Sequence, residues 1–272
     1  MAASVRDPEE AKATPDFPAL SELLWQLADD DLLIGFRASE WLGLGVHIEE
    51  DIAFASIAQD EMGHAMTYFQ LLEALGMGRA DDLAQLRPVS ERRNSILVEW
   101  PNGEGDYAET PHFDWAFTLV RHFLYDQFEI IRLEGLCQSR YAPLAEAAAA
   151  ILGEKAYHRD HQQLWLDRLL THGAESRARV ERAVAQAAQL AGDLTDLGPW
   201  GNQVAEAGWW PGADQAGARW QQAVESFLGR YQLAPPTWSC PGNGRRGDHS
   251  PHLDAALAVL SEVYRQDPLA QW

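Results

Sequence analysis

Four long stretches with the spacing of amphipathic helices dominate the sequence, and they fall into two pairs. Their apolar residues recur at intervals of three, four or seven, which places them on one face of a helix. Only short breaks separate the members of a pair, whereas a long segment rich in turn formers, residues 79–111, separates the two pairs and is expected to hold a short strand. Two helical hairpins joined by one long crossover predict an all-α four-helix bundle. The four stretches run over about residues 20–42, 49–75, 113–141 and 144–172.

The segments on either side of this bundle are expected to be organised differently. Residues 1–17 are polar and acidic and contain two prolines, so we expect a flexible tail there. Residues 18–272 are expected to form a single helical domain, with the bundle core over 20–172 and additional C-terminal helices and loops over 173–272. Three weaker helical stretches in that last part run over about residues 175–192, 214–231 and 251–265.

Acidic residues outnumber basic ones by 41 to 21, which gives a formal net charge of −20. The field of such a chain repels nucleic acids and anionic membranes, so neither is an expected partner, and an anionic substrate would need a local basic pocket. No run of about 18 apolar residues is available to span a bilayer. The two cysteines, Cys137 and Cys240, have neither metal-site nor redox-motif spacing. These features predict a cytoplasmic protein in a reducing compartment.

The apolar face of the second stretch is interrupted by Glu61 and His64, which lie three residues apart and therefore project on the same side. Ferritin-like bundles use a Glu-x-x-His pair on an inward face to offer a carboxylate and an imidazole to two metal ions. Asp31 lies on the inward face of the first stretch, 30 residues before Glu61, so an antiparallel hairpin brings the two to one level. The first hairpin thus predicts a ferritin-like fold with Asp31, Glu61 and His64 as metal ligands.

The second hairpin repeats this pattern in either of two registers. In one register, Glu129 on the third stretch stands with His158 and His161 on the fourth, which mirrors the first hairpin. In the other register, Asp126 stands with Glu154 and His158, which are four residues apart. Spacing alone does not choose between the registers, so all five residues are candidate metal ligands.

Inward carboxylates need a cation beside them. Each buried carboxylate left unpaired costs several kcal/mol, against a total stability of roughly 5–15 kcal/mol. One or two metal ions would supply the charge, and mixed carboxylate and imidazole ligation suits iron, manganese or zinc. Two matched ligand sets favour this metal hypothesis. The alternative is a buried ion-pair network whose cation is a side chain, with the candidates Arg37, Arg121, Arg132 and Lys155.

Four segments form a specific combination, namely LADDDLLIGFRASEWLG at 27–43, VEWPNG at 98–103, EKAYH at 154–158 and GDHSPHL at 247–253. Together they resemble the PaaC-type subunit of the bacterial ring 1,2-phenylacetyl-CoA epoxidase, over nearly the whole chain from about residue 20. The resemblance implies a ferritin-like, all-helical subunit of a multicomponent monooxygenase of phenylacetate breakdown. It also implies that the partner is a homologous catalytic subunit, which holds a di-iron centre and binds the CoA thioester. A homodimer is a second possible assembly.

This chain departs from the resembled structural subunit in one respect. The structural subunit has commonly lost the residues at its metal-ligand positions, whereas Glu61 and His64 are present here, with Asp31 and Glu129 in support. We therefore expect an epoxidase subunit with a metal-binding capacity of its own, for iron in the first place. A self-sufficient di-iron oxidase that uses O2 is the rival hypothesis. A ferritin-like metal-storage protein ranks last, because the tail and the tryptophan-rich loops do not suit a cage.

Overall fold

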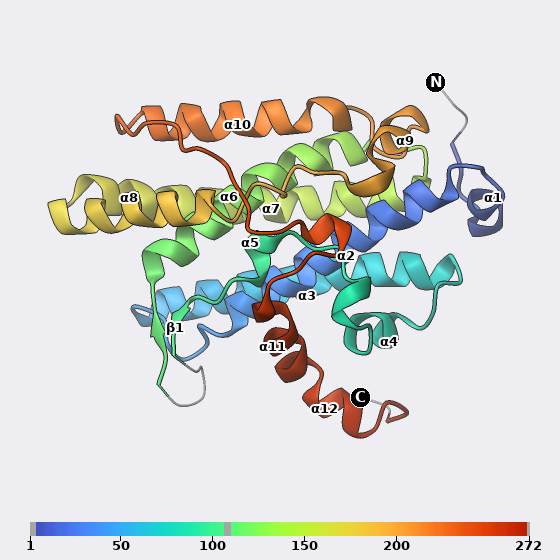
Figure 1. The fold of residues 1–272 in the computed structure, drawn as a ribbon, viewed down its shortest axis with the longest axis horizontal. Coiled ribbons are helices and arrows are strands. Elements are labelled where there is room, and N and C mark those ends of the chain that lie inside the picture. The colour runs from blue at the N-terminus through green and yellow to red at the C-terminus, as the bar shows by residue number, and fades with distance from the viewer. Residues whose placement is uncertain (1–3, 106–109, 271–272) are drawn as a thin grey trace.

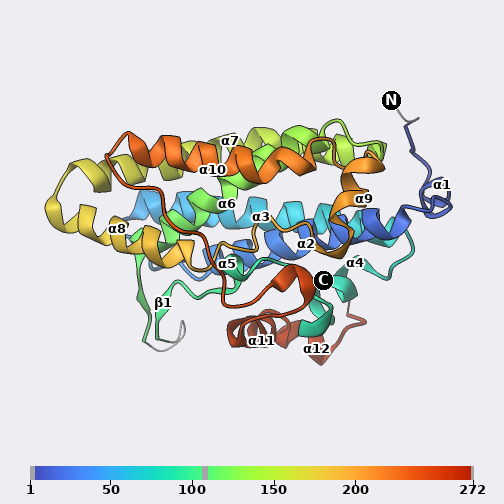
Figure 2. The same ribbon diagram turned by 45° about the horizontal axis from the view of Figure 1, so that its top comes forward.

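The computed structural model describes residues 4–105 and 110–270 and contains the four long helices expected from the sequence. They are α2 (Phe17–Ser39), α3 (Ile48–Ala74), α6 (Trp115–Leu136) and α7 (Ala142–Thr171). Helix α2 packs along α3, α6 packs along α7, and the two hairpins meet through α3 and α7 (Figures 1 and 2). The prediction of an all-α, ferritin-like four-helix bundle with extra C-terminal helices is confirmed.

Local sequence signals account for where these helices begin and end. The Asp114 side chain accepts hydrogen bonds from the backbone amides of Ala116 and Phe117 and so caps the start of α6. Pro143 lies in the first turn of α7, where its missing amide costs no hydrogen bond. Between α2 and α3, Gly43 has a φ of +79°, a left-handed conformation that glycine adopts without strain. The two hairpins therefore turn where the sequence offers turn formers.

The connection between the hairpins is more structured than its sequence indicates. It contains α4 (Ala80–Gln85), η1 (Val89–Glu91), α5 (Ile96–Glu99) and the strands β1 (Gly103–Glu104) and β2 (His112–Phe113). The strands are antiparallel, with Gly103 opposite Phe113 and Glu104 opposite His112. A short strand was expected here, whereas helices of four to six residues are too short to show a hydrophobic period. Residues 106–109 of this connection lie outside the described residues.

The C-terminal part packs on two sides of the bundle, with α8 and α10 on α6 and α11 beside α2 and α5 (Figure 1). Helices α8 and α10 both pack on α6, and the Trp220 indole of α10 donates a hydrogen bond of 2.9 Å to the Leu124 carbonyl (Figure 1). The last helix expected from the sequence is divided in two at Ser261, whose hydroxyl donates to the Leu257 carbonyl at 2.6 Å. The elements are α8 (Ala174–Ala188), η2 (Gly198–Trp200), α9 (Gly201–Glu206), α10 (Ala213–Gly229), η3 (Gly244–Arg246), α11 (Pro251–Leu260) and α12 (Glu262–Gln266).

The N-terminal segment corrects the expectation of a tail outside the fold. Of residues 1–17, the first three lie outside the described part, but the rest pack on the bundle through α1 (Pro8–Lys12). Val5 is fully buried; its amide donates to the Arg140 carbonyl and its carbonyl accepts from the Ala142 amide, both at 2.8 Å. The segment has too few apolar residues to show a period, yet one buried valine and two backbone hydrogen bonds fix it beside the start of α7.

Buried apolar residues form two clusters of unequal size. The larger spans both hairpins and the C-terminal helices, whereas the smaller consists of Ala38, Trp41, Phe54, Ile57 and Ala58. Along α3, buried polar residues separate the small cluster from the residues of the large one. Among the described residues, no helix is long and apolar enough to cross a membrane.

Candidate functional site

Charged side chains from all four long helices meet inside the bundle. Each of them is at most 5% exposed. Each of these residues lies on the same helix face as the apolar residues around it, so it points into the bundle together with them. They are Asp31 on α2, Glu61 and His64 on α3, Asp126, Glu129 and Arg132 on α6, and Lys155 and His158 on α7. We call this set the buried charge cluster.

Lys155 lies at the centre of the buried charge cluster. Its Nζ donates hydrogen bonds to both carboxylate oxygens of Glu61, at 2.7 Å each, and to Oδ1 of Asp126 at 3.1 Å. The ring centroid of Tyr125 lies 4.8 Å from the same nitrogen. Burial alone would lower the pKa of Lys155, but the charges of Glu61 and Asp126 raise that pKa above its ordinary value. The ammonium therefore stays charged.

Glu61 is the carboxylate that the basic groups share. Burial would raise the pKa of Glu61, yet the adjacent charge of Lys155 and the hydrogen bond from His158 hold it well below its ordinary value. His158 Nδ1 lies 3.2 Å from Oε1 of Glu61, and its Nε2 lies 3.1 Å from Oδ2 of Asp60. Asp60 is partly exposed, so His158 connects a surface carboxylate to the buried one.

His64 makes a second connection of this kind. Its Nδ1 lies 3.5 Å from Oε2 of Glu61, and its Nε2 lies 2.6 Å from Oε2 of Glu154. The side chain of Glu154 is 56% exposed, so Glu154 lies at the surface end of this connection. Burial alone would lower the pKa of His64, but Glu61 raises it to about 9. His64 is therefore an imidazolium at neutral pH.

Arg132 supplies a further buried side-chain cation beside the carboxylates. Its Nε donates to Oε2 of Glu129 at 2.7 Å, and its Nη1 donates to Oδ2 of Asp30 at 3.0 Å. Asp31 instead accepts a hydrogen bond from the Tyr125 hydroxyl. Burial, with the nearby charge of Glu129, raises the pKa of Asp31 to about 8. Below that pH Asp31 is a neutral acid that needs no cation of its own.

Three consecutive aspartates on α2 are buried and point in different directions from the helix. Asp29, Asp30 and Asp31 are all fully buried. Asp29 accepts from Arg87 at 2.9 Å and from Arg92 at 3.0 Å, which joins α2 to the crossover. Because successive residues on a helix point about 100° apart, each aspartate meets a different set of partners.

The structure combines parts of both registers left open by the sequence. His158 contacts Glu61 directly and Asp126 meets Glu61 through Lys155, whereas Glu129 pairs with Arg132. Two of the candidate ligands lie apart from the cluster centre: Glu154 meets His64 from outside, and His161 Nε2 lies 2.7 Å from Oε2 of Glu50. Sequence reasoning did not identify Tyr125, Asp60 or Glu50, although Tyr125 and Asp60 each adjoin a candidate ligand in the chain.

Buried acidic and histidine side chains here could hold a metal ion. Two triads offer one ligand atom per residue within 4.8 Å of one another: Asp31 with Glu61 and His64, and Glu61 with Asp126 and His158. Glu61 belongs to both triads, and both of its oxygens already accept from Lys155. Lys155 also contacts Asp126 of the second triad. As arranged, these residues do not fit a pair of metal ions, because a side-chain cation occupies the position between the carboxylates.

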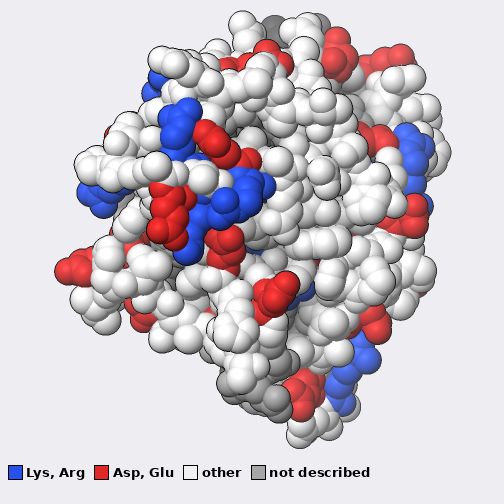
Figure 3. Space-filling view, turned by 60° about the vertical axis from the view of Figure 1, so that its left-hand side comes forward, with Lys and Arg blue, Asp and Glu red and all other residues white. Residues whose placement is uncertain are grey.

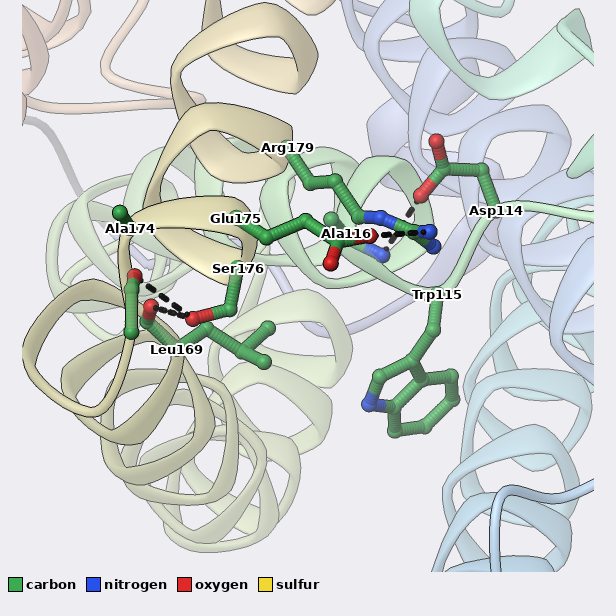
Figure 4. Close-up of a pocket in the computed structure, with 9 residues that line it drawn as sticks. Asp114, Trp115, Ala116, Leu169, Ala174, Glu175, Ser176 and Arg179 are labelled. Carbon is green, nitrogen blue, oxygen red and sulfur yellow. Dashed lines mark hydrogen bonds and ion pairs between the residues drawn. The ribbon is translucent and has the colours of Figure 1, made fainter.

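Two surface pockets lie apart from the buried charge cluster. One, of about 540 Å³, lies where α6 begins, and its one basic lining residue, Arg179, pairs with Glu175 at 3.0 Å (Figure 4). The other, of about 1300 Å³, is lined by one arginine, Arg37, whose side chain bonds the Glu99 carbonyl and Glu40. Figure 3 shows basic and acidic side chains interspersed on the end of the molecule that lies at the left in Figure 1. Neither of these two pockets offers an unpaired positive charge, whereas a third, of about 700 Å³, is lined by Arg87 and Arg265.

Comparison with known proteins places these features in a family. The chain matches the family described as phenylacetic acid catabolic protein over residues 3–272. It is 27% identical to the C subunit of the Escherichia coli (strain K12) 1,2-phenylacetyl-CoA epoxidase over 249 residues, which cover 91% of this chain and 96% of that protein. It is 24% identical to the A subunit of the same epoxidase over 133 residues, which cover 49% of this chain and 40% of that protein.

Proposed function

Because the chain belongs to the family of phenylacetic acid catabolic proteins, we propose that it is the non-catalytic subunit of a 1,2-phenylacetyl-CoA epoxidase-type complex. Its partner in this proposal is a homologous catalytic subunit, which carries the di-iron centre and binds the thioester. The nearly full-length match to the C subunit of an epoxidase supports this assignment, and so does the partial match to the A subunit. The complex is cytoplasmic in this proposal, in keeping with two cysteines that form no disulfide.

The position of Lys155 is the observation that carries the non-catalytic role. An ammonium held between Glu61 and Asp126 supplies positive charge to both carboxylates, but it neither changes oxidation state nor binds O2. The side chains that bind metal in catalytic ferritin-like bundles here stabilise the interior of the protein.

Reconstitution tests this function. This chain and its homologous catalytic partner are purified separately and together, supplied with O2, an electron donor and phenylacetyl-CoA, and assayed for the epoxide by mass spectrometry. We expect a stable complex by light scattering, product only when the catalytic partner is present, and no product from this chain alone.

The rival hypothesis of a self-sufficient oxidase is favoured by the two ligand triads. Turnover by this chain without a partner would establish that rival and overturn our proposal.

A further inference from the structure

Lysine is a rare residue in this chain, and its use is selective. Of the 21 basic residues, 19 are arginines and two are lysines, Lys12 and Lys155. Lys12 lies near the surface in α1 and pairs with Glu9 of the same helix. Lys155 is fully buried and contacts two fully buried carboxylates. An ammonium is a compact point charge, whereas a guanidinium is a wide planar fork, so lysine resembles a small metal ion more closely than arginine does.

The atoms around Lys155 have the character of a metal-binding triad. Its Nζ lies 2.7 Å from both oxygens of Glu61 and 3.1 Å from Oδ1 of Asp126. The ligand atoms of Glu61, Asp126 and His158 lie within 4.8 Å of one another, close enough to surround one ion. Their donor set of two carboxylates and one imidazole suits a divalent transition metal.

The environment of His158 supports the same reading. Its Nδ1 faces Oε1 of Glu61 at 3.2 Å, while its Nε2 lies 3.1 Å from Oδ2 of Asp60. A carboxylate on the far nitrogen is the arrangement that orients a metal-ligating imidazole and fixes its tautomer. Asp126 adds a second feature, because its Oδ2 is buried and has no hydrogen-bond partner among the described residues. That oxygen is free to ligate.

We propose that Lys155 is a built-in cation that fills a metal position, and that removing its ammonium converts Glu61, Asp126 and His158 into a binding site for one divalent transition-metal ion. Without Lys155 the carboxylates of Glu61 and Asp126 lose the positive charge of the ammonium, and a bound metal ion supplies positive charge in its place. Metal binding is then coupled to stability, because an ion that binds the folded state alone raises the melting temperature. The proposal concerns the isolated chain and is independent of its assembly with a partner.

The test is metal uptake by Lys155→Met, with Lys12→Met and the wild type as matched controls. Each protein is incubated with Zn²⁺ or, without oxygen, with Fe²⁺, then freed of loose metal by gel filtration and analysed by mass spectrometry for metal per chain. We expect about one ion per Lys155→Met chain and about one tenth of that or less in both controls. The melting temperature of Lys155→Met is expected to rise with metal by about 5 °C or more, and that of the controls to stay unchanged.

Further variants keep the test decisive. Adding Glu61→Gln to Lys155→Met removes a ligand and should abolish uptake. If Lys155→Met does not fold alone, Lys155→Gln, whose amide still donates to a carboxylate, is measured in its place, and both variants are refolded with and without Zn²⁺. Recovery that depends on the metal supports the proposal. The proposal is overturned if the folded variants take up no more metal than the wild type, or if Zn²⁺ does not improve refolding. The reconstitution experiment is a separate test, because its result bears only on the proposed place of the chain in an epoxidase complex.

Discussion

Replacing Arg245 with methionine is expected to lower the free energy of unfolding by about 3–5 kcal/mol, because it breaks a buried ion pair and leaves Arg132 as the one arginine on the buried carboxylate of Asp30. Arg245 is fully buried, and its Nη1 and Nη2 donate to the two oxygens of Asp30 at 2.9 and 2.8 Å. The same side chain bonds the carbonyl of Arg93 at 2.8 Å. This residue thus ties the C-terminal segment to both α2 and the crossover.

The neighbouring arginine provides a matched control. The side chain of Arg246 is 53% exposed and pairs with Asp196 at 3.1 Å, so Arg246→Met should cost less than about 1 kcal/mol. Denaturant unfolding of the wild type and both variants measures how much each substitution lowers the free energy of unfolding. Equal losses at the two positions would show that Arg245 is no more important to stability than a surface ion pair.

Raising the pH from about 6 to about 9.5 is expected to destabilise the protein, with about 3 kcal/mol of the loss due to His64. The pKa of His64 is raised to about 9 in the folded protein, so the stability that it contributes is fully present below its unfolded value of 6.5 and is lost as the pH rises through 9. Asp31 acts in the same direction, because its pKa of about 8 keeps a proton on the folded chain that the unfolded chain has released.

His64→Gln tests this pH dependence. The variant should show a smaller difference in unfolding free energy between the two pH values than the wild type does, by about the 3 kcal/mol assigned to His64. His172→Gln, at an exposed position after α7, serves as the control and should retain the wild-type difference. A His64→Gln variant with an undiminished pH difference would contradict the role of the Glu61 contact.

Hydrophobic periodicity was sufficient to predict the four long helices and the crossover, because apolar residues recur along each helix at helical spacing. It failed for α4 and α5, whose few residues cannot show a period, and at Ser261, where a side-chain hydrogen bond to the backbone divides one expected helix into two. It also failed at the N-terminus, where two buried residues, Val5 and Ala11, are too few to show a period.

The candidate site could be predicted only as a set of inward-facing residues. Helical spacing correctly placed Asp31, Glu61 and Asp126 in the interior. It could not say which cation meets each carboxylate, because a metal ion and a lysine ammonium satisfy the same charge requirement. Lys155 was among the candidate cations, and only its distances to Glu61 and Asp126 distinguish it from the other candidates.

Iron uptake by the wild-type chain tests most directly whether a side chain, rather than metal, balances the buried carboxylates. The purified protein is loaded with Fe²⁺ under anaerobic conditions, and iron per chain is measured by mass spectrometry before and after exposure to O2. With Lys155 on Glu61 and Arg132 on Glu129, we expect iron near background and no oxygen-dependent absorbance. About two irons per chain with an absorbance that develops in O2 would contradict this account and establish a di-iron site in this protein.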